Sequence, residues 1–248
     1  MFTALTPNTG DTFQVQAFTP SAGAWLEQIF AHEATPGVVR VRSPKMHDNV
    51  QNLRLQVTNS IAQRLLPPAA MQELYPQDTI TFEATGGAAE TDVAFLQLYY
   101  ADNPGASQRL ALWAQVKPRI KNILSVEVAV TGAATLGDWS AGTPINTTFD
   151  LLKANTDYAV LGYLAGGAIG AVALAGPDTS NFKVGGPGGL DPIESTSYFV
   201  DMSNAYGTPH IPIINSANRG ATLAYQCSAL ASATTNVDFI CAELAAGA

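Results

Sequence analysis

Charged residues are scarce in this sequence. Asp, Glu, Lys and Arg make up 13% of the 248 residues, whereas soluble domains average roughly 25%. Basic residues are the scarcer kind, 12 against 20 acidic ones, and no run of Lys or Arg occurs, so the net charge is −8. Because binding nucleic-acid phosphates needs a basic field, no specific nucleic-acid binding is expected. A largely neutral surface suits a protein that packs against copies of itself.

Cysteine is almost absent. The chain has only Cys227 and Cys241, too few for a disulfide framework. If 221–227 and 237–244 form a hairpin, the two cysteines face each other at a distance that a disulfide can bridge. Reduced thiols are the alternative, because the N-terminus shows no signal-peptide pattern and a reducing compartment is then expected. The sequence leaves open whether the two are bonded.

Metal-binding patterns are also missing. The three histidines are His32, His47 and His210, and none has a second His, Cys or carboxylate at an established spacing such as H-E-x-x-H. We expect His47 in a solvated turn and His210, which lies near two prolines, in a structural or interfacial position. The sequence therefore predicts no metal ligand.

Catalytic patterns are equally weak. No serine lies in a G-x-S-x-G elbow. Glu83 with Glu90 or Asp92 could form a glycosidase-like acid pair, but that signal is unspecific. The glycines of 166–170 lack the full G-x-G-x-x-G spacing, and we interpret 185–189 as a flexible connector. We therefore predict a protein that is not an enzyme, with no catalytic or cofactor-binding residue and no cofactor.

The chain does contain many short alternating apolar segments, separated by Gly and Pro turns, which are typical of half-buried strands. We predict strands near 12–18, 38–42, 53–57, 79–83, 93–100, 123–130, 148–152, 210–214, 221–227 and 237–244. Helical spacing is weaker and predicts short helices at 60–66, 69–74, 108–116 and 197–206. The predicted class is all-β with a few short helices.

A degenerate repeat relates the two halves. Gly37–Pro44 resembles Gly170–Pro177 at an offset of 133 residues, and the same offset puts Trp25 on Tyr158 and Phe30 on Tyr163. Near the ends of the halves, Thr91–Leu96 resembles Thr235–Ile240. Chance similarity among β-rich segments is the alternative. We interpret the blocks as two tandem jelly-roll (β-sandwich) barrels with short helices between late strands. The modules are 1–102 and 123–248, joined by a helical linker at 103–122.

The uncharged stretch from Tyr158 to Gly176 is long enough for a membrane helix and has G-x-x-x-G spacing. It also holds five glycines, each unfavourable in a helix, and its counterpart in the first half is charged. We therefore predict no transmembrane segment but two strands, 158–165 and 169–175, that turn at Gly166-Gly167. One face would contact the barrel core and the other a neighbouring barrel. On this interpretation Ala173→Arg would spare the fold and impair assembly.

The two repeated modules, the linker and the low charge together give a sequence that resembles the double jelly-roll major capsid proteins of tailless icosahedral viruses, including bacteriophages. The resemblance implies a homotrimer with a pseudo-hexagonal outline that self-assembles into an icosahedral shell. It also implies assembly in the host cytoplasm, contact with other virion proteins such as a penton, and an internal membrane or layer beneath the shell. No catalytic residue is implied.

Other functions remain open on the sequence. One is a different virion protein, a head-decoration protein or a spike. Another is a carbohydrate-binding β-sandwich module, which should expose an aromatic cluster; the only adjacent aromatic pair is Tyr99-Tyr100, on a predicted buried strand. A hydrolase on a β scaffold has the least support.

Overall fold

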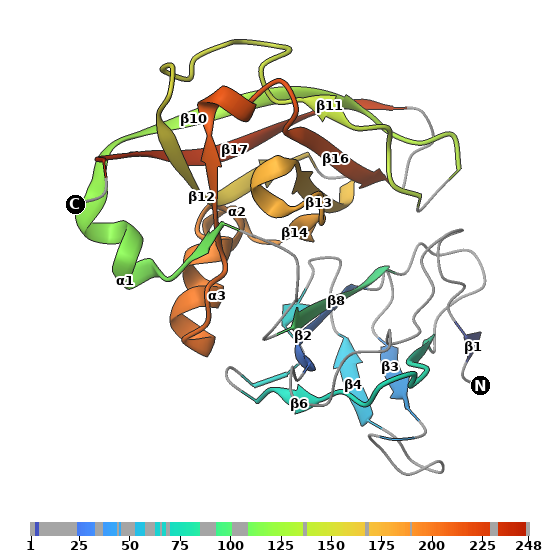
Figure 1. Ribbon diagram of the computed structural model, residues 1–248. Coiled ribbons are helices and arrows are strands. Elements are labelled where there is room, and N and C mark those ends of the chain that lie inside the picture. The colour runs from blue at the N-terminus through green and yellow to red at the C-terminus, as the bar shows by residue number, and fades with distance from the viewer. Residues whose placement is uncertain are drawn as a thin grey trace. The chain divides into compact units, whose positions relative to one another are not determined.

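The computed structural model divides into two compact units, Met1–Pro104 and Gly105–Ala248 (Figure 1). It describes residues 3–4, 24–32, 37–43, 45, 53–57, 63–64, 66–67, 70–84, 93–100, 109–135, 138–166, 169–188, 190–228 and 233–246. Antiparallel strands dominate both units, so the predicted all-β class is confirmed at that level. The stretch 103–122, predicted as a linker, belongs to the second unit from Gly105 onward.

The second unit contains two sheets, with strand orders β10-β17-β12-β15-β9 and β11-β16-β13-β14. The elements are β9 (Leu110–Ala111), α1 (Trp113–Val116), η1 (Lys117–Arg119), β10 (Ile120–Thr131), β11 (Thr143–Pro144), β12 (Asp157–Ala165), β13 (Ile169–Ala175), η2 (Pro177–Thr179), β14 (Val184–Pro187), α2 (Pro192–Thr196), α3 (Tyr198–Tyr206), β15 (Ile211–Asn215), η3 (Ser216–Asn218), β16 (Leu223–Ser228) and β17 (Thr234–Leu244).

Strands β10 to β17 pair in a nested order, the first with the last. β10 pairs with β17, β11 with β16, β12 with β15 and β13 with β14, all antiparallel. β17 also pairs with β12, and β16 with β13, which joins the nested pairs into the two sheets. The unit is therefore one long antiparallel ribbon distributed over two sheets.

The core of the second unit contains a cluster of three aromatic rings. Tyr163 of β12 packs against Tyr198 and Phe199 of α3, with ring centroids 5.6 Å and 6.3 Å away. The Tyr163 hydroxyl donates a hydrogen bond to the Pro187 carbonyl of β14 at 2.6 Å, which satisfies its polar end in a buried site. The cluster therefore ties α3 and β14 to the central strand β12.

The helix predicted at 197–206, closed by Gly207, is confirmed as α3. Its buried residues include Tyr198, Phe199 and Met202, and Gly207 has φ of 67°, the left-handed conformation that glycine adopts at helix ends. The preceding helix, α2, begins with Pro192, and the Asp191 side chain accepts a hydrogen bond from the Ile193 N–H. Both helices pack against β12.

The first unit also contains two sets of paired strands. Its strands are β1 (Thr3–Ala4), β2 (Ala24–His32), β3 (Gly37–Arg42), β4 (Leu53–Val57), β5 (Gln63–Arg64), β6 (Gln72–Glu73), β7 (Thr81–Ala84) and β8 (Val93–Tyr100). One sheet has the order β1-β7-β3-β4; in the other, β2 pairs with β5, β6 and β8.

The blocks matched in the sequence repeat lie on strands with the same neighbours. Gly37–Pro44 contains β3, which lies between β4 and β7, as β13 lies between β14 and β16. β2 pairs with β8 as β12 pairs with β17, so the Thr91 and Thr235 blocks also correspond. Among the described residues of the first unit, no strand corresponds to β10.

Several local predictions were wrong. Residues in the predicted helices 60–66 and 69–74 form β5 and β6, because pairing with β2 overrides a weak helical preference. Of the predicted helix 108–116 the structure describes 109–116, where only Trp113–Val116 is α-helical, and 148–152 forms no strand. The predicted connector 185–189 contributes to β14, where a Cβ on Gly185 would lie 1.9 Å from the Val172 carbonyl oxygen. The predicted strand 12–18 lies outside the described residues.

The stretch 158–176 does form two strands, β12 and β13, as predicted, but they belong to different sheets. Within the described parts of the chain, no helix is long and apolar enough to cross a membrane. Every residue of β13 is buried within the single chain, including Ala173 at 1% exposure. A neighbouring barrel is therefore not needed to cover its second face. Ala173→Arg should destabilise the fold itself, contrary to the expectation from the sequence.

A buried glutamine fills a gap in the pairing of β2. β2 pairs with β6 at Trp25 and Leu26 and with β5 at Phe30 and Ala31. Between these pairs, the Gln28 amide donates to the Leu66 carbonyl at 2.8 Å and accepts from the Leu66 N–H at 2.7 Å. The side chain thereby replaces a missing backbone partner.

We expect Gln28→Ala to lower the free energy of unfolding of the first unit by about 2–4 kcal/mol, because it leaves buried backbone groups unpaired and opens a cavity. Urea unfolding of the full chain measures the change. Gln115→Ala is the control, since exposed Gln115 only accepts a hydrogen bond from the Leu112 N–H and its loss should cost less than about 1 kcal/mol. Equal effects of the two changes would contradict the role of Gln28.

Candidate functional site

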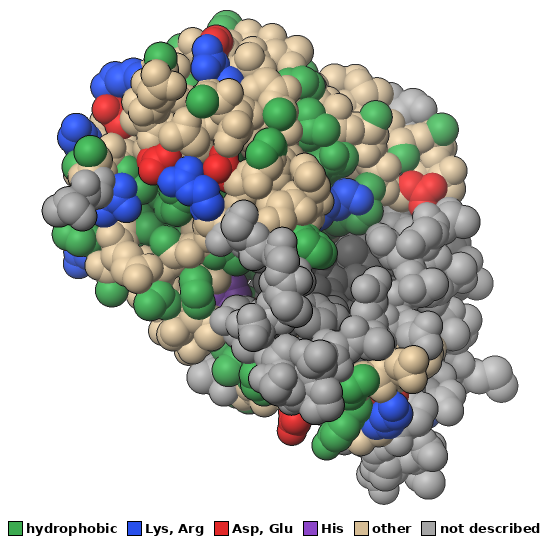
Figure 2. All heavy atoms as spheres, viewed as in Figure 1, with side chains coloured by type: hydrophobic (Ala, Val, Ile, Leu, Met, Phe, Trp, Pro, Cys, Tyr) green, Lys and Arg blue, Asp and Glu red, His purple; other side chains and the backbone are tan. Residues whose placement is uncertain are grey.

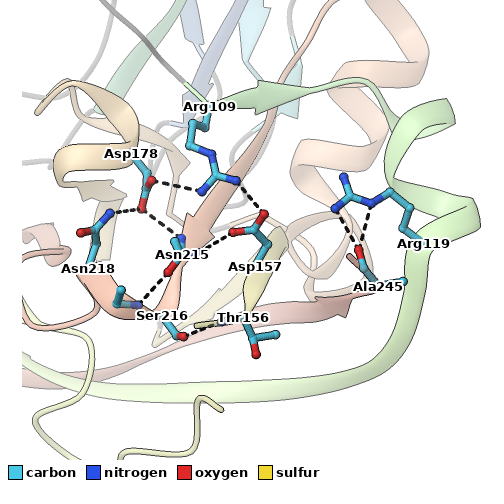
Figure 3. Close-up of polar contacts among 10 residues, drawn as sticks. Arg109, Arg119, Thr156, Asp157, Asp178, Asn215, Ser216, Asn218 and Ala245 are labelled. Carbon is cyan, nitrogen blue, oxygen red and sulfur yellow. Dashed lines mark hydrogen bonds and ion pairs between the residues drawn. The ribbon is translucent and has the colours of Figure 1, made fainter. Parts of the chain in front are cut away.

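Arg109 holds together a polar cluster at the start of the second unit (Figure 3). Its guanidinium donates to Asp157 at 2.7 Å and to Asp178 at 3.2 Å. Asn215 joins the two carboxylates, donating from its side chain to Asp157 at 2.8 Å and from its backbone to Asp178 at 3.0 Å. The Asn218 amide donates to Asp178 at 3.0 Å. All four carboxylate oxygens therefore have donors.

Because every carboxylate oxygen of Asp157 and Asp178 already accepts a hydrogen bond within the chain, we interpret the cluster as structural. The hydrogen bond from Arg109, with a further one from Asn215, holds the pKa of Asp157 below its ordinary value. The same bond to Asp157 raises the pKa of Arg109. A general base needs an oxygen that is not already hydrogen-bonded, and neither carboxylate offers one. The cluster instead fixes the start of β12, the η2 turn and the end of β15 to the segment that opens the second unit.

β10 forms one edge of the five-stranded sheet. In the described part of the chain its only strand partner is β17. Val126, Val128 and Val130 are buried, whereas Ser125 and Ala129, on the opposite face, are exposed. The N–H of Ala129 donates to the Thr148 hydroxyl at 3.2 Å, from the segment between β11 and β12. This edge is a surface on which another molecule could pair.

Large apolar side chains are exposed on the second unit. Ile123 of β10 is 56% exposed, and Phe149 and Leu151, shortly after Thr148, are 56% and 58% exposed. On the face seen in Figure 2, basic and acidic side chains of this unit lie beside one another, with apolar side chains between them. A mixed surface of this kind suits contact between proteins better than binding of a highly charged ligand.

A second surface feature is a lysine between two aromatic rings. The Lys183 ammonium lies 5.2 Å from the centroid of Trp139 and 5.3 Å from that of Tyr225, within cation–π range. Both rings are half-buried, and the adjacent Phe182 is exposed. This is an aromatic cluster of the kind that a carbohydrate-binding module would expose.

The structure separates the two cysteines. Cys227 lies on β16 opposite Ala171, whereas Cys241 lies on β17 in the other sheet, opposite Leu124 and Val160. The hairpin that would have opposed them does not form, and no disulfide joins them. Burial raises the pKa of Cys241 to about 12, so its thiol stays protonated at neutral pH.

The structure describes only some of the histidines and acidic residues considered in the sequence. His210 is buried, and its Nε2 lies 2.8 Å from the Thr208 hydroxyl, which fits a structural position. His32 ends β2 and Glu83 lies in β7, whereas His47, Glu90 and Asp92 lie outside the described residues. Across the described ranges, no three His, Cys, Asp or Glu side chains are grouped as metal ligands.

Comparisons of the chain with protein-family models, with curated proteins and with solved structures gave no match. Its function is therefore inferred from the arrangement of its own residues.

Proposed function

We propose that this protein is a viral major capsid protein built of two tandem jelly rolls, which assembles as trimers with a pseudo-hexagonal outline into an icosahedral shell. The trimer would contact neighbouring trimers and other virion proteins such as a penton, with an internal membrane or layer beneath the shell. Assembly would take place in the host cytoplasm. No catalytic role is part of this proposal.

The nested strand order carries the proposal. A jelly roll pairs eight strands as first with eighth, second with seventh, third with sixth and fourth with fifth, over two sheets. In the second unit β10 to β17 have these four pairings. The first unit shares the second-with-seventh, third-with-sixth and fourth-with-fifth pairings if β5 and β6 together count as the sixth strand.

The composition of the chain and the Arg109 cluster support the same function. Neutral flanks suit a subunit that packs against copies of itself, and only 13% of the residues are charged. Arg109 lies four residues after the start of the second unit and is held by two carboxylates, which anchors the segment that enters this unit.

A carbohydrate-binding module is the second candidate, and the Trp139–Lys183–Tyr225 cluster favours it. Glycans stack on exposed aromatic faces, and both rings are accessible from the surface. Lys183 already lies over both rings, so a sugar would have to displace its ammonium group. This displacement makes the cluster weaker support than the strand order.

The oligomeric state of the purified full chain separates the two functions. We expect trimers by light scattering, and shells or sheets of pseudo-hexagonal units by negative-stain electron microscopy. A monomer at all concentrations that binds a glycan array, and loses that binding in Trp139→Ala, would overturn the capsid proposal. A head-decoration protein or spike would form trimers that do not assemble further.

A further inference from the structure

We propose that two copies of this chain associate through the outer edges of their β10 strands, paired antiparallel about a two-fold axis at Leu124. The partner is a second copy of the same chain. The contact goes beyond the proposed capsid function, because it does not depend on trimer formation. In a shell it would join one trimer to the next.

The edge offers unpaired backbone groups over a defined length. Because N–H and C=O groups along a strand point alternately to either side, the outward N–H of Ala129 indicates that those of Ile123, Ser125 and Glu127 also point away from β17. In the described part of the chain, no strand pairs on this side. The Thr148 hydroxyl occupies the edge at Ala129, and a register shift between Ile120 and Asn122 interrupts the strand at its other end.

Leu124 lies within this open edge, and the charged residues on either side of it are complementary about that point. Antiparallel pairing centred on Leu124 brings Lys121 of each copy, the residue at the register shift, near Glu127 of the other copy. Lys121 is exposed and Glu127 half-buried, and neither forms an ion pair with a residue that the structure describes. Centring the pairing on Ser125 instead would place Lys121 opposite Ala129 and Glu127 opposite Ile123, with no charge match. The charges therefore favour one register.

Charges on edge strands commonly protect them from pairing. Edge charges of one sign repel a second copy in any register that places two of them opposite each other. Lys121 and Glu127 have opposite signs and are equally far from Leu124. They attract a second copy in the Leu124 register and give no such gain in the Ser125 register, so they favour one contact instead of preventing both.

Apolar contacts would add to the pairing. Half-buried Leu124 would lie directly opposite Leu124 of the other copy. Their N–H groups point back toward β17 of their own chains, so the two residues would form a non-hydrogen-bonded pair. Ile123, 56% exposed in the single chain, would lie opposite Ser125 of the other copy. Phe149 directly follows Thr148 and lies beside the end of the same edge.

Disulfide trapping tests the register. Leu124 and its mate would have Cα atoms about 4.5 Å apart, within disulfide range, whereas Ser125 and its mate would be diagonal neighbours about 7–8 Å apart. The variants are Leu124→Cys and Ser125→Cys in a chain that carries Cys227→Ser and Cys241→Ala, because Cys241 lies opposite Leu124 in the same chain. We expect oxidation to give at least tenfold more covalent dimer from Leu124→Cys. Equal trapping, or more from Ser125→Cys, would overturn the register.

Charge exchange tests the same contact without a cysteine. We expect Glu127→Lys alone or Lys121→Glu alone to weaken association of the full chain at least tenfold at low salt, because each puts like charges opposite one another twice. The double variant restores the pairing and should associate within about threefold of the natural chain. Sedimentation velocity measures the dissociation constant. Unchanged association in both single variants, or no recovery in the double variant, would overturn the proposal.

The results also distinguish this contact from the capsid function. If Glu127→Lys forms trimers and normal shells, the edge contact fails and the capsid proposal stands. If the natural chain forms no trimer and Leu124→Cys is still trapped as a dimer, the capsid proposal fails and the edge contact stands.

Discussion

Adding one methyl group at position 162 should lower the free energy of unfolding of the second unit by at least about 2–3 kcal/mol. A Cβ on Gly162 would lie 2.3 Å from the carbonyl oxygens of Ser195 and Thr196. These are backbone atoms at the end of α2, so no side-chain rotation can relieve the overlap. Helix α2 would have to move away from β12, and α3 follows it directly in the chain.

Gly220→Ala is the matched control for Gly162→Ala. A Cβ at Gly220 meets no atom within 4 Å, so the same methyl group should change stability by no more than about 0.5 kcal/mol. Thermal and urea unfolding of the full chain give the comparison, and hydrogen exchange at β12 and β17 localises the effect. Equal stability of the two variants would mean that α2 does not pack on β12 as described.

The sequence predicted the positions of many strands but not their pairing. Apolar runs and turn residues marked β12, β13 and β17, because these patterns are local. The assignment of β12 and β13 to different sheets depends on partners in β15, β16 and β17, which no local pattern reveals. The repeat contained part of this information, since its matched blocks lie on strands with the same neighbours. The periodicity of apolar residues alone could not show which strands pair.

The polar cluster was missed for the same reason. Arg109 is 48 residues from Asp157 and 69 from Asp178, so no motif spacing connects them. Gln28 and Leu66 are 38 residues apart, in a segment where the sequence predicted a helix. The glycines of β14 looked like a loop because their actual constraint, close approach to β13, is a tertiary contact. Polar residues with partners far away in the chain give a single sequence no signal.

The second large effect is expected at Asp157. We expect Asp157→Asn to lower the free energy of unfolding by about 1–3 kcal/mol at pH 7, the range for a buried hydrogen-bonding group that loses its partner. The amide removes the charge opposite Arg109 and turns at least one donor toward Arg109 or Asn215, which both donate to this carboxylate. The remaining carboxylate, Asp178, keeps Arg109 partly held, which limits the loss.

This effect should disappear in acid. The pKa of Asp157 is lowered in the folded state, so its contribution is fully present above the ordinary Asp value of about 3.9 and is lost as pH falls through the folded-state pKa. The difference in stability between the natural chain and Asp157→Asn should therefore stay constant from pH 7 to about 5 and shrink below about pH 4. Urea unfolding at several pH values measures it.

Asp150→Asn is the isosteric control for this experiment. Asp150 pairs with Arg219 at 2.8 Å, but its side chain is 43% exposed, and surface ion pairs contribute about 0–1 kcal/mol. We expect a loss of less than about 1 kcal/mol that falls further with added salt. The loss at Asp157 should persist in salt, because its side chain is only 25% exposed and its donors are fixed by β15 and the start of the second unit. If the two variants lose equal stability and respond equally to salt, the Arg109 cluster is only a surface ion pair and does not anchor the second unit.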